Sequence, residues 1–329
     1  MSVAIPAYNA QATIAQTLDS VLAQTHRNLD IVVVDDGSTD GTWEVLQRYE
    51  GRIRAIRQIN SGIGVARNVS VQAARGEFIA LLDADDLCAP NRLSIQLRYL
   101  RAHPNILLCS SDFGAFDANG PLAQSYCGEY YHRCSPALGG VQARYPHVES
   151  FQWRADEAVR VYWGQVYGEL VQGNFIHPPT VMFRREALQR AGFFDPDIRI
   201  VCEWEWFVRV ARVGPVAHLD LPLLDYRRSP TQISSNPRTA LDSFAVARKI
   251  YALDPELARR APALARKRLG QLSLSAADAM ARVDAWQALR IWLASWARYR
   301  KLNMRTLRVL AKILLPAVVQ DAMRREPRS

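Results

Sequence analysis

Short apolar runs rich in β-branched residues alternate with longer amphipathic segments over roughly the first third of the chain. Runs of this kind predict strands, and segments with helical spacing of apolar residues predict helices. The expected strands cover residues 2–6, 30–36, 53–58, 77–83 and 106–113, and the expected helices cover residues 11–24, 40–50, 63–74 and 90–102. Alternation of the two predicts an α/β fold, a mostly parallel sheet with flanking crossover helices.

The pattern changes twice further along the chain. Residues 114–172 lose the alternation and are rich in Gly, Pro and aromatic residues, which predicts an irregular insertion over a cleft. We then expect a strand at 174–183, helices at 184–191 and 203–212, and an edge strand at 216–219. These elements predict a catalytic domain over residues 1–237 and a basic helical C-terminal extension over residues 238–329.

Composition narrows the class of protein. The chain is 49% hydrophobic and 22% charged, which is typical of a folded globular protein. Its 41 Lys and Arg residues against 32 Asp and Glu residues give a formal charge of +9, which favours anionic partners. No recognition motif indicates nucleic acid. The five cysteines have no zinc-ligand spacing, and no leader or membrane-spanning apolar run is found, so we expect a cytoplasmic protein with reduced thiols.

The first candidate for chemistry is Asp36, which follows the apolar run Val32–Val34 and precedes Gly37. Ligands of open parallel sheets bind outside the carboxyl ends of the strands, so this carboxylate is expected to face the crevice. It is suited to accept a hydrogen bond from the NH of a pyrimidine base. The alternative is that Asp36, Ser38 and Thr39 only cap the next helix.

A second buried run, residues 78–82, ends in Asp83-Ala84-Asp85-Asp86. Residues two apart on an extended chain project to one side, so Asp83 and Asp85 are expected to converge while Asp86 points away. Such a carboxylate pair suits Mn²⁺ or Mg²⁺, whose other ligands would be phosphate oxygens. Acids at strand ends are also often solvated turn residues, and the triplet alone does not decide between these interpretations.

Between these motifs, residues 60–68 form a Gly-containing loop that leads into a helix. Gly62 and Gly64 allow close backbone approach to a ligand, and Arg67 suits a diphosphate or a base. The spacing matches neither GxGxxG nor a P-loop. The alternative is an ordinary turn with Arg67 in a surface ion pair.

Five ordered motifs resemble those of family 2 inverting glycosyltransferases of the GT-A fold, over roughly residues 2–236. They are Ile5-Pro6-Ala7-Tyr8-Asn9, Gln24-Thr25, Val34–Asp40, Asn60–Asn68 and Leu82–Asp86. The resemblance implies a nucleotide-sugar site, most simply for a UDP-sugar, made by Pro6, Ala7, Tyr8, Asp36, Asn60, Gly62, Arg67, Asp83, Ala84, Asp85 and Arg227. It implies that Asp83 and Asp85 bind the metal, Mn²⁺ or Mg²⁺.

The same resemblance assigns the catalytic base. The family has Glu-Asp-Trp-Asp where this chain has Cys202-Glu203-Trp204-Glu205, so matching the tryptophan makes Glu203 the base and Glu205 its rival. Two residues apart on a helix, the two carboxylates point about 200° apart, so only one is expected to face the cleft. Arg227 lies in a segment that resembles Tyr-Arg-x-His, with Ser229 in place of the His. His177 is expected to shape the acceptor pocket or to be an ordinary loop histidine.

The predicted function is transfer of a sugar from a nucleotide-diphosphate sugar to a hydroxyl of a glycan or lipid-linked acceptor, in bacterial surface-polysaccharide assembly. The alternatives are a non-catalytic nucleotide-sugar or glycan-binding protein of the same fold and a sugar nucleotidyltransferase. At the end of the chain, residues 304–319 place Leu307, Leu310, Leu314 and Val318 on one helical face. That face predicts either peripheral contact with the inner face of the cytoplasmic membrane or packing against the catalytic domain.

Overall fold

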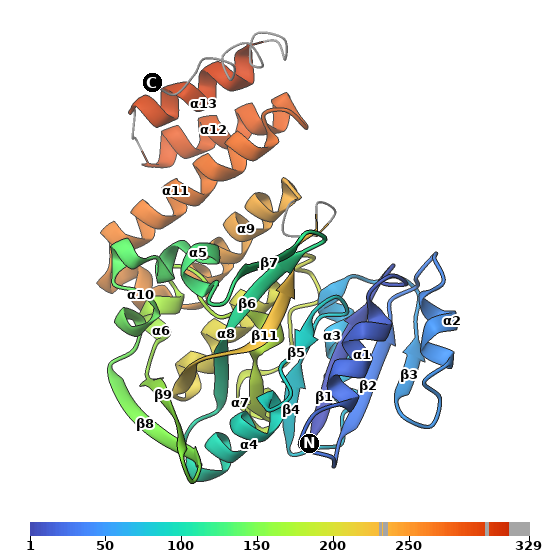
Figure 1. The fold of residues 1–329 in the computed structure, drawn as a ribbon. Coiled ribbons are helices and arrows are strands. Elements are labelled where there is room, and N and C mark those ends of the chain that lie inside the picture. Colours follow the sequence, from blue (N-terminus) through green and yellow to red (C-terminus); the bar gives the residue numbers. More distant parts are fainter. Residues whose placement is uncertain (230–231, 233–235, 300–302, 316–329) are drawn as a thin grey trace. The chain divides into compact units, whose positions relative to one another are not determined.

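The computed structural model describes residues 1–229, 232, 236–299 and 303–315. It divides into two compact units, an α/β unit (Met1–Ser229) and a helical unit (Pro230–Ser329). The sequence pattern predicts a domain boundary after residue 237, and the compact α/β unit ends at Ser229. Figure 1 labels the helices and strands of both units.

One eleven-stranded sheet forms the centre of the α/β unit, with the strand order β3-β2-β1-β4-β10-β6-β11-β9-β8 and with β5 and β7 paired at its side. The strands are β1 Ser2–Ala7, β2 Asp30–Asp35, β3 Arg54–Arg57, β4 Phe78–Leu81, β5 Leu87–Cys88, β6 Leu108–Asp117, β7 Gly120–Ala123, β8 His147–Arg154, β9 Glu157–Gly164, β10 Met182–Arg184 and β11 Val216–Arg227. Strands β3, β2, β1 and β4 are mutually parallel and form what we call the parallel half.

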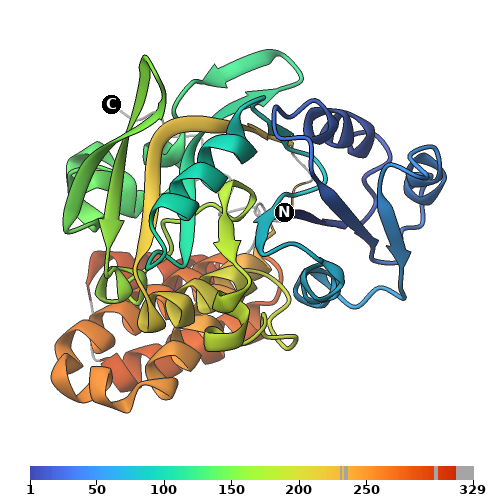
Figure 2. The same cartoon turned by 90° about the horizontal axis from the view of Figure 1, so that it is seen from below.

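Helices cover both faces of the parallel half, which explains why its central strands β1, β2 and β4 are buried at almost every position. β1 is buried along its whole length. Helices α1 (Ile14–Leu22) and α2 (Thr42–Gln47) lie on one face and α3 (Ile63–Ala73) lies on the other, as the blue helices of Figure 2 show. The apolar face of α3 packs on β2, where Ala66 joins Val32 and Val34 in a buried cluster.

Strands β6 to β11 with their helices form the mixed half. β10 runs antiparallel to β4 and β6, β11 runs parallel to β6, and β8 and β9 form an antiparallel hairpin at the edge. The helices are α4 Arg92–Ala102, α5 Cys127–Tyr130, α6 Tyr167–Leu170, α7 Glu186–Ala191 and α8 Cys202–Val213, with short 3₁₀ turns at His132–Cys134, Pro136–Leu138, Val141–Arg144 and Pro178–Thr180.

Three predictions for the mixed half are wrong. The insertion at 114–172 is not irregular throughout, because β8 and β9 pair along eight residues each. The strand expected at 174–183 is reduced to β10, since Pro178 and Pro179 lack the NH groups that a ladder needs and begin a 3₁₀ turn. The edge strand expected at 216–219 is the start of β11, an interior strand that pairs with both β6 and β9.

The helical unit consists of α9 (Arg238–Leu253), α10 (Pro255–Arg260), α11 (Pro262–Met280), α12 (Ala285–Tyr299) and α13 (Met304–Leu314). Its core is formed by apolar residues from α11 to α13, namely Leu274, Ala277, Met280, Ala281, Ala288, Trp292, Val309 and Ile313. None of the described helices has the combination of length and apolar character that crossing a membrane requires.

The apolar positions of α13 divide between two surroundings. Val309 and Ile313 are buried in the core of the helical unit, and Leu310 packs partly against it. Leu307 and Leu314 are exposed. Val318, the last member of the expected apolar face, lies outside the described residues.

Candidate active site

The candidate residues of the parallel half gather at the carboxyl ends of its strands. The chain runs from β1 to β2 to β3 in one direction, and β4 pairs on the other side of β1, so the strand order reverses between β1 and β4. Crevices at such reversals are where open α/β sheets bind ligands. Tyr8 follows β1, Asp36 follows β2 and Asp83 follows β4, so all three lie at the carboxyl ends of these strands.

Asp36 holds the loop that begins α3. Its Oδ1 accepts hydrogen bonds from Gln58 Nε2 at 2.7 Å and the Ser61 amide at 2.9 Å, and its Oδ2 accepts one from the Gly62 amide at 2.8 Å. The carboxylate is buried, and its hydrogen bonds go to residues 58–62 and not to the first turn of α2, whose N-cap residue is Gly41. The capping alternative for Asp36 is therefore wrong.

Two glycines allow this loop to approach the β2 turn. Gly37 has φ +70°, and a Cβ there would lie 2.6 Å from the backbone nitrogen of Asn60, so a larger residue would displace the loop. Gly62 has φ +90° and stands at the N-terminus of α3 with open space around it. Asn60 is exposed beside it. Free backbone NH groups at a helix N-terminus are suited to phosphate oxygens.

Arg67 on α3 joins the two acidic motifs. Its Nη2 lies 3.0 Å from Asp83 Oδ1 and its Nη1 lies 3.0 Å from Glu203 Oε2. Burial lowers the pKa of the guanidinium, but the charges of Asp83 and Glu203 outweigh burial and hold its pKa above the usual value. The surface ion pair considered as an alternative is wrong, because the Arg67 side chain is only 3% exposed.

Asp83, Asp85 and Asp86 form an acidic turn after β4. Burial, and then the charge of Asp83, raise the pKa of Asp85 to about 6. Asp86 is fully buried and accepts a hydrogen bond from the Arg227 amide at 2.9 Å, so it fixes the turn to β11. Ala84 is buried, and its carbonyl accepts hydrogen bonds from Thr13 and Thr17 of α1 at 3.0 and 3.1 Å.

The carboxylate oxygens of the acidic turn suit a divalent cation. Asp83 and Asp85 repel one another, and a hard cation with oxygen ligands relieves this repulsion. Mg²⁺ and Mn²⁺ commonly take one or two carboxylates and complete their coordination with substrate phosphates and water. Over the described ranges, His, Cys, Asp and Glu side chains do not gather in groups of three or more that would enclose a metal without substrate.

Arg227 lies at the end of β11 and reaches the same turn. Its Nε donates to the Asp85 carbonyl at 2.8 Å and its Nη2 donates to Gln16 Oε1 at 2.6 Å. Its guanidinium also lies 4.6 Å from the centroid of the Phe116 ring. These contacts place a cation beside the carboxylates, where a leaving diphosphate would need charge compensation.

The structure separates Glu203 from Glu205. Both begin α8, yet Glu203 reaches Arg67, whereas Glu205 is 2% exposed and is held by Arg209 four residues later at 2.7 Å from both of its oxygens. Arg67 and the Cys202 thiol both contact Oε2 of Glu203. No hydrogen bond from the described residues reaches its Oε1. Glu203 therefore belongs to the crevice, and Glu205 belongs to an intrahelical ion pair.

The first motif, Pro6 to Asn9, lies at the end of β1. Pro6 and Ala7 are buried in β1, and the Ala7 carbonyl accepts a hydrogen bond from the Asp36 amide at 2.8 Å. Tyr8 is 49% exposed. The following Asn9 has φ +50°, and its side chain accepts a hydrogen bond from the Thr39 amide, which ties the end of β1 to the β2 turn.

Aromatic residues from the insertion and from β11 pack around Phe113 and His177. The His177 ring stacks on Phe113 with centroids 4.1 Å apart, and Tyr130 and Tyr226 contact both rings edge-on. Burial, together with the charges of Arg67 and Arg92, lowers the pKa of His177 to about 3, so the ring is neutral. Its Nε2 has no hydrogen-bond partner among the described residues. Most of these aromatics therefore form a packed wall.

Of the residues that make these contacts, Gln16 carried no recognisable sequence signal, whereas Cys202 and Gly64 stand in motifs that the sequence indicated. Gln16 contacts Arg227 across more than two hundred residues of sequence, and Cys202 Sγ lies 3.7 Å from Arg67 Nη1 where the family has an acid. Gly64 is explained by the same packing, since a Cβ there would lie 3.2 Å from the Asp195 carbonyl and 3.5 Å from Cys202 Sγ.

Comparison with known proteins agrees with this geometry. The model of the family described as "Glycosyl transferase family 2" matches residues 2–192, more than half of the chain, and the chain belongs to that family. An uncharacterized glycosyltransferase of Rickettsia felis is 35% identical over 247 residues, which is 74% of this chain and 34% of that protein.

Two further proteins are informative. The Escherichia coli protein WfaP, a UDP-Glc:alpha-D-GlcNAc-diphosphoundecaprenol beta-1,3-glucosyltransferase, is 37% identical over 102 residues, 30% of this chain and 41% of that one. The mannosyltransferase PcManGT of Pyrobaculum calidifontis, solved with GDP-Man and Mn²⁺, has TM-score 0.55 at 20% identity, over 99% of this chain and 87% of that one. The chain thus spans 34% of the length of the Rickettsia felis relative and 41% of the length of WfaP, less than half of each. The fold is the GT-A fold.

Proposed function

We propose that this chain is an inverting glycosyltransferase that moves a hexose from a nucleoside-diphosphate sugar to a hydroxyl group of a surface-polysaccharide precursor. The observation that carries the proposal is Arg67, which pairs with Asp83 and Glu203 at 3.0 Å each. This arginine brings the acidic turn that suits a diphosphate and the carboxylate that suits a general base into one crevice.

In this proposal the parallel half binds the donor. Pro6, Ala7, Tyr8 and the loop held by Asp36 contact the nucleoside, with Asn60 and Gly62 at the loop edge. Asp83 and Asp85 would hold Mn²⁺ or Mg²⁺, which when bound stabilises negative charge on the nucleoside diphosphate. Arg227 supplies a second positive charge near the leaving group.

Glu203 is the proposed general base. It takes the proton of an acceptor hydroxyl while the oxygen attacks the anomeric carbon and the bond from that carbon to the diphosphate breaks, so the configuration inverts. Arg67 orients the carboxylate through Oε2 and leaves Oε1 for the acceptor. The neutral wall around His177 and Phe113 bounds the acceptor side and keeps water from it.

The donor and acceptor classes rest on the relatives. WfaP is named for a UDP-sugar and a diphosphoundecaprenol-linked acceptor, which supports a UDP-sugar and a lipid-linked glycan here. PcManGT binds Mn²⁺ with a GDP-sugar. This supports a metal ion in the site here, but it does not favour UDP over GDP as the donor nucleotide. Exposed Leu307 and Leu314 on α13, with Arg308 between them, support contact with the inner face of the cytoplasmic membrane.

A second candidate is a non-catalytic nucleotide-sugar-binding protein of the same fold. It is favoured by Cys202, a buried thiol in the position of an acid. It predicts that the donor binds and that no sugar is transferred or released.

Titration calorimetry with UDP, dTDP and GDP, each with and without Mn²⁺, tests the donor site. We expect one nucleotide to bind in the presence of Mn²⁺, and Asp85→Ala to weaken that binding by about tenfold or more, because a metal ligand is lost. Asp156→Ala, in the exposed turn between β8 and β9, is the matched control and should bind normally. Binding that Asp85→Ala leaves intact would contradict the assignment of the metal site.

A further inference from the structure

The basic excess of the chain belongs to the helical unit alone. Residues 230–329 contain 19 Lys and Arg residues and 7 Asp and Glu residues, a formal charge of +12. Residues 1–229 contain 22 and 25 respectively, a formal charge of −3. The donor crevice therefore does not explain the net charge of the protein. An excess of this size in one unit indicates an anionic partner for that unit.

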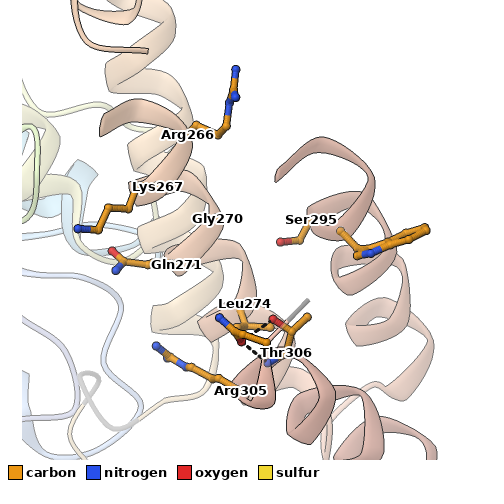
Figure 3. A pocket seen from close by; sticks show the side chains of 10 residues that line it. Arg266, Lys267, Gly270, Gln271, Leu274, Ser295, Arg305 and Thr306 are labelled. Carbon is orange, nitrogen blue, oxygen red and sulfur yellow. Dashed lines mark hydrogen bonds between the residues drawn. The ribbon is translucent and has the colours of Figure 1, made fainter. Parts of the chain in front are cut away.

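A pocket of about 180 Å³ lies among α11, the end of α12 and the start of α13 (Figure 3). Three of its lining residues are cationic, Arg266 and Lys267 from α11 and Arg305 from α13. The other residues that matter here are Gly270, Ser295 and Trp296. No carboxylate lines the pocket within the part of the chain that the structure describes.

Hydrogen bonds between helices fix the walls of this pocket. Ser273 of α11 and Ser295 of α12 share a hydrogen bond of 2.7 Å. Trp292 Nε1 donates to the Thr306 carbonyl at 3.0 Å, which joins α12 to α13. Arg305 Nη2 donates to Ser275 Oγ at 3.2 Å, which ties α13 to α11. The cationic side chains are thus mounted on helices that are already fastened to one another.

Gly270 gives the pocket room. It stands in the middle of the nineteen-residue helix α11, where glycine costs about 1 kcal/mol relative to alanine. A side chain at this position would occupy the pocket that Gly270 lines. Figure 3 shows Gly270 between Lys267 and Gln271 on one helix, with Ser295 pointing from the facing helix toward it.

We propose that this pocket binds a phosphate group, carried either by the headgroup of an anionic lipid or by a soluble phosphate ligand. Two guanidinium groups and an ammonium group match the charge and the acceptor oxygens of a phosphate. The volume is below the usual range of about 300–1,000 Å³ for whole small-molecule ligands, so it fits a phosphate with its nearest substituents. The proposal does not depend on the donor site.

Two probes distinguish the sources of the phosphate. Inorganic diphosphate is titrated calorimetrically into the full chain in buffer with a chelator, which prevents metal-dependent binding at Asp83 and Asp85. Flotation with vesicles of phosphatidylcholine and phosphatidylglycerol, in a molar ratio of about 3 to 1, measures the lipid headgroup, and pure phosphatidylcholine vesicles are the blank. Binding in the first assay assigns a soluble phosphate ligand, and binding in the second alone assigns the lipid headgroup.

Charge-matched variants test whether the pocket is responsible. R266Q/K267Q/R305Q removes the three lining cations, and R238Q/R290Q/R298Q removes three exposed cations of the helical unit that do not line it. We expect about a tenfold or greater loss of affinity for the first variant and less than about a twofold loss for the second, because only the first loses charge-assisted hydrogen bonds.

Gly270→Leu keeps every charge and fills the pocket, and leucine is a better helix former than glycine, so the helix is expected to remain folded. It should weaken binding as the lining variant does. Equal losses for the lining and control triples would overturn the proposal, because they indicate diffuse attraction to a basic surface. Failure of wild-type protein to bind either probe, or full binding by Gly270→Leu, would overturn it as well.

Discussion

The parallel half and the mixed half of the sheet contribute to the site in different ways. In the parallel half, the functional residues follow their strands directly, and Asp36 and Asp83 come within a few residues of the ends of β2 and β4. In the mixed half, Glu203 and Arg227 come from a helix and an interior strand whose positions depend on pairing across the whole unit. Arg67 joins the halves through two ion pairs. The candidate residues of the parallel half are thus placed by local motifs, and those of the mixed half by long-range contacts.

The largest expected effect separates the roles of two carboxylates in the mixed half. Glu203→Gln should lower kcat by a factor of about 10² to 10⁴, because a general base is lost while the side chain keeps its size. The measurement is release of the nucleoside diphosphate from the donor sugar in the presence of acceptor. Glu205→Gln is the matched variant and should retain most of kcat at temperatures where it is folded. A reversed order of activities would transfer the role of base to Glu205.

A smaller effect concerns stability. Glu205→Gln should lower the free energy of unfolding by about 2 to 4 kcal/mol, because a nearly buried carboxylate held by Arg209 at two oxygens is lost. Urea denaturation followed by circular dichroism measures it. The control is Glu186→Gln, which breaks an exposed ion pair with Arg190 and should cost about 0.5 kcal/mol or less. Equal losses would show that the buried Glu205–Arg209 pair contributes no more to the free energy of unfolding than the exposed Glu186–Arg190 pair.

The smallest effect is a dependence of stability on pH in the mixed half, which holds both buried histidines of the α/β unit. Burial lowers the pKa of His218 from 6.5 to about 4, with Asp220 opposing the shift. Between these values the unfolded chain binds a proton that the folded chain does not, so stability falls as pH is lowered through this window. The slope attributable to His218 is at most about 1.4 kcal/mol per pH unit.

His218→Gln tests this slope. Urea denaturation of wild type and variant at about pH 7, 6 and 5 should show a smaller loss of stability on acidification for the variant. His132→Gln, at an exposed position, is the control and should follow wild type. Parallel pH profiles for all three proteins would remove His218 as the cause.

The sequence predicted the parallel half well because its elements are encoded locally. Each of the strands expected at 2–6, 30–36, 53–58 and 77–83 exists, and the helices between them exist with shorter ends. The predictions of a strand at 174–183 and of an edge strand at 216–219 were wrong. Their positions depend on which neighbours β10 and β11 acquire, and a local apolar pattern carries no information about distant partners.

The sequence by itself determined the family motifs, the acidic turn after β4 and the pair of candidate bases. Only the tertiary structure decided that Glu205 forms an ion pair with Arg209 and that Glu203 forms one with Arg67. It also decided that the carboxylate of Asp36 holds the loop at Ser61 and Gly62. The physical reason is that residue type and spacing fix which groups follow each strand, whereas ion pairing between distant segments depends on how the sheet and its helices pack.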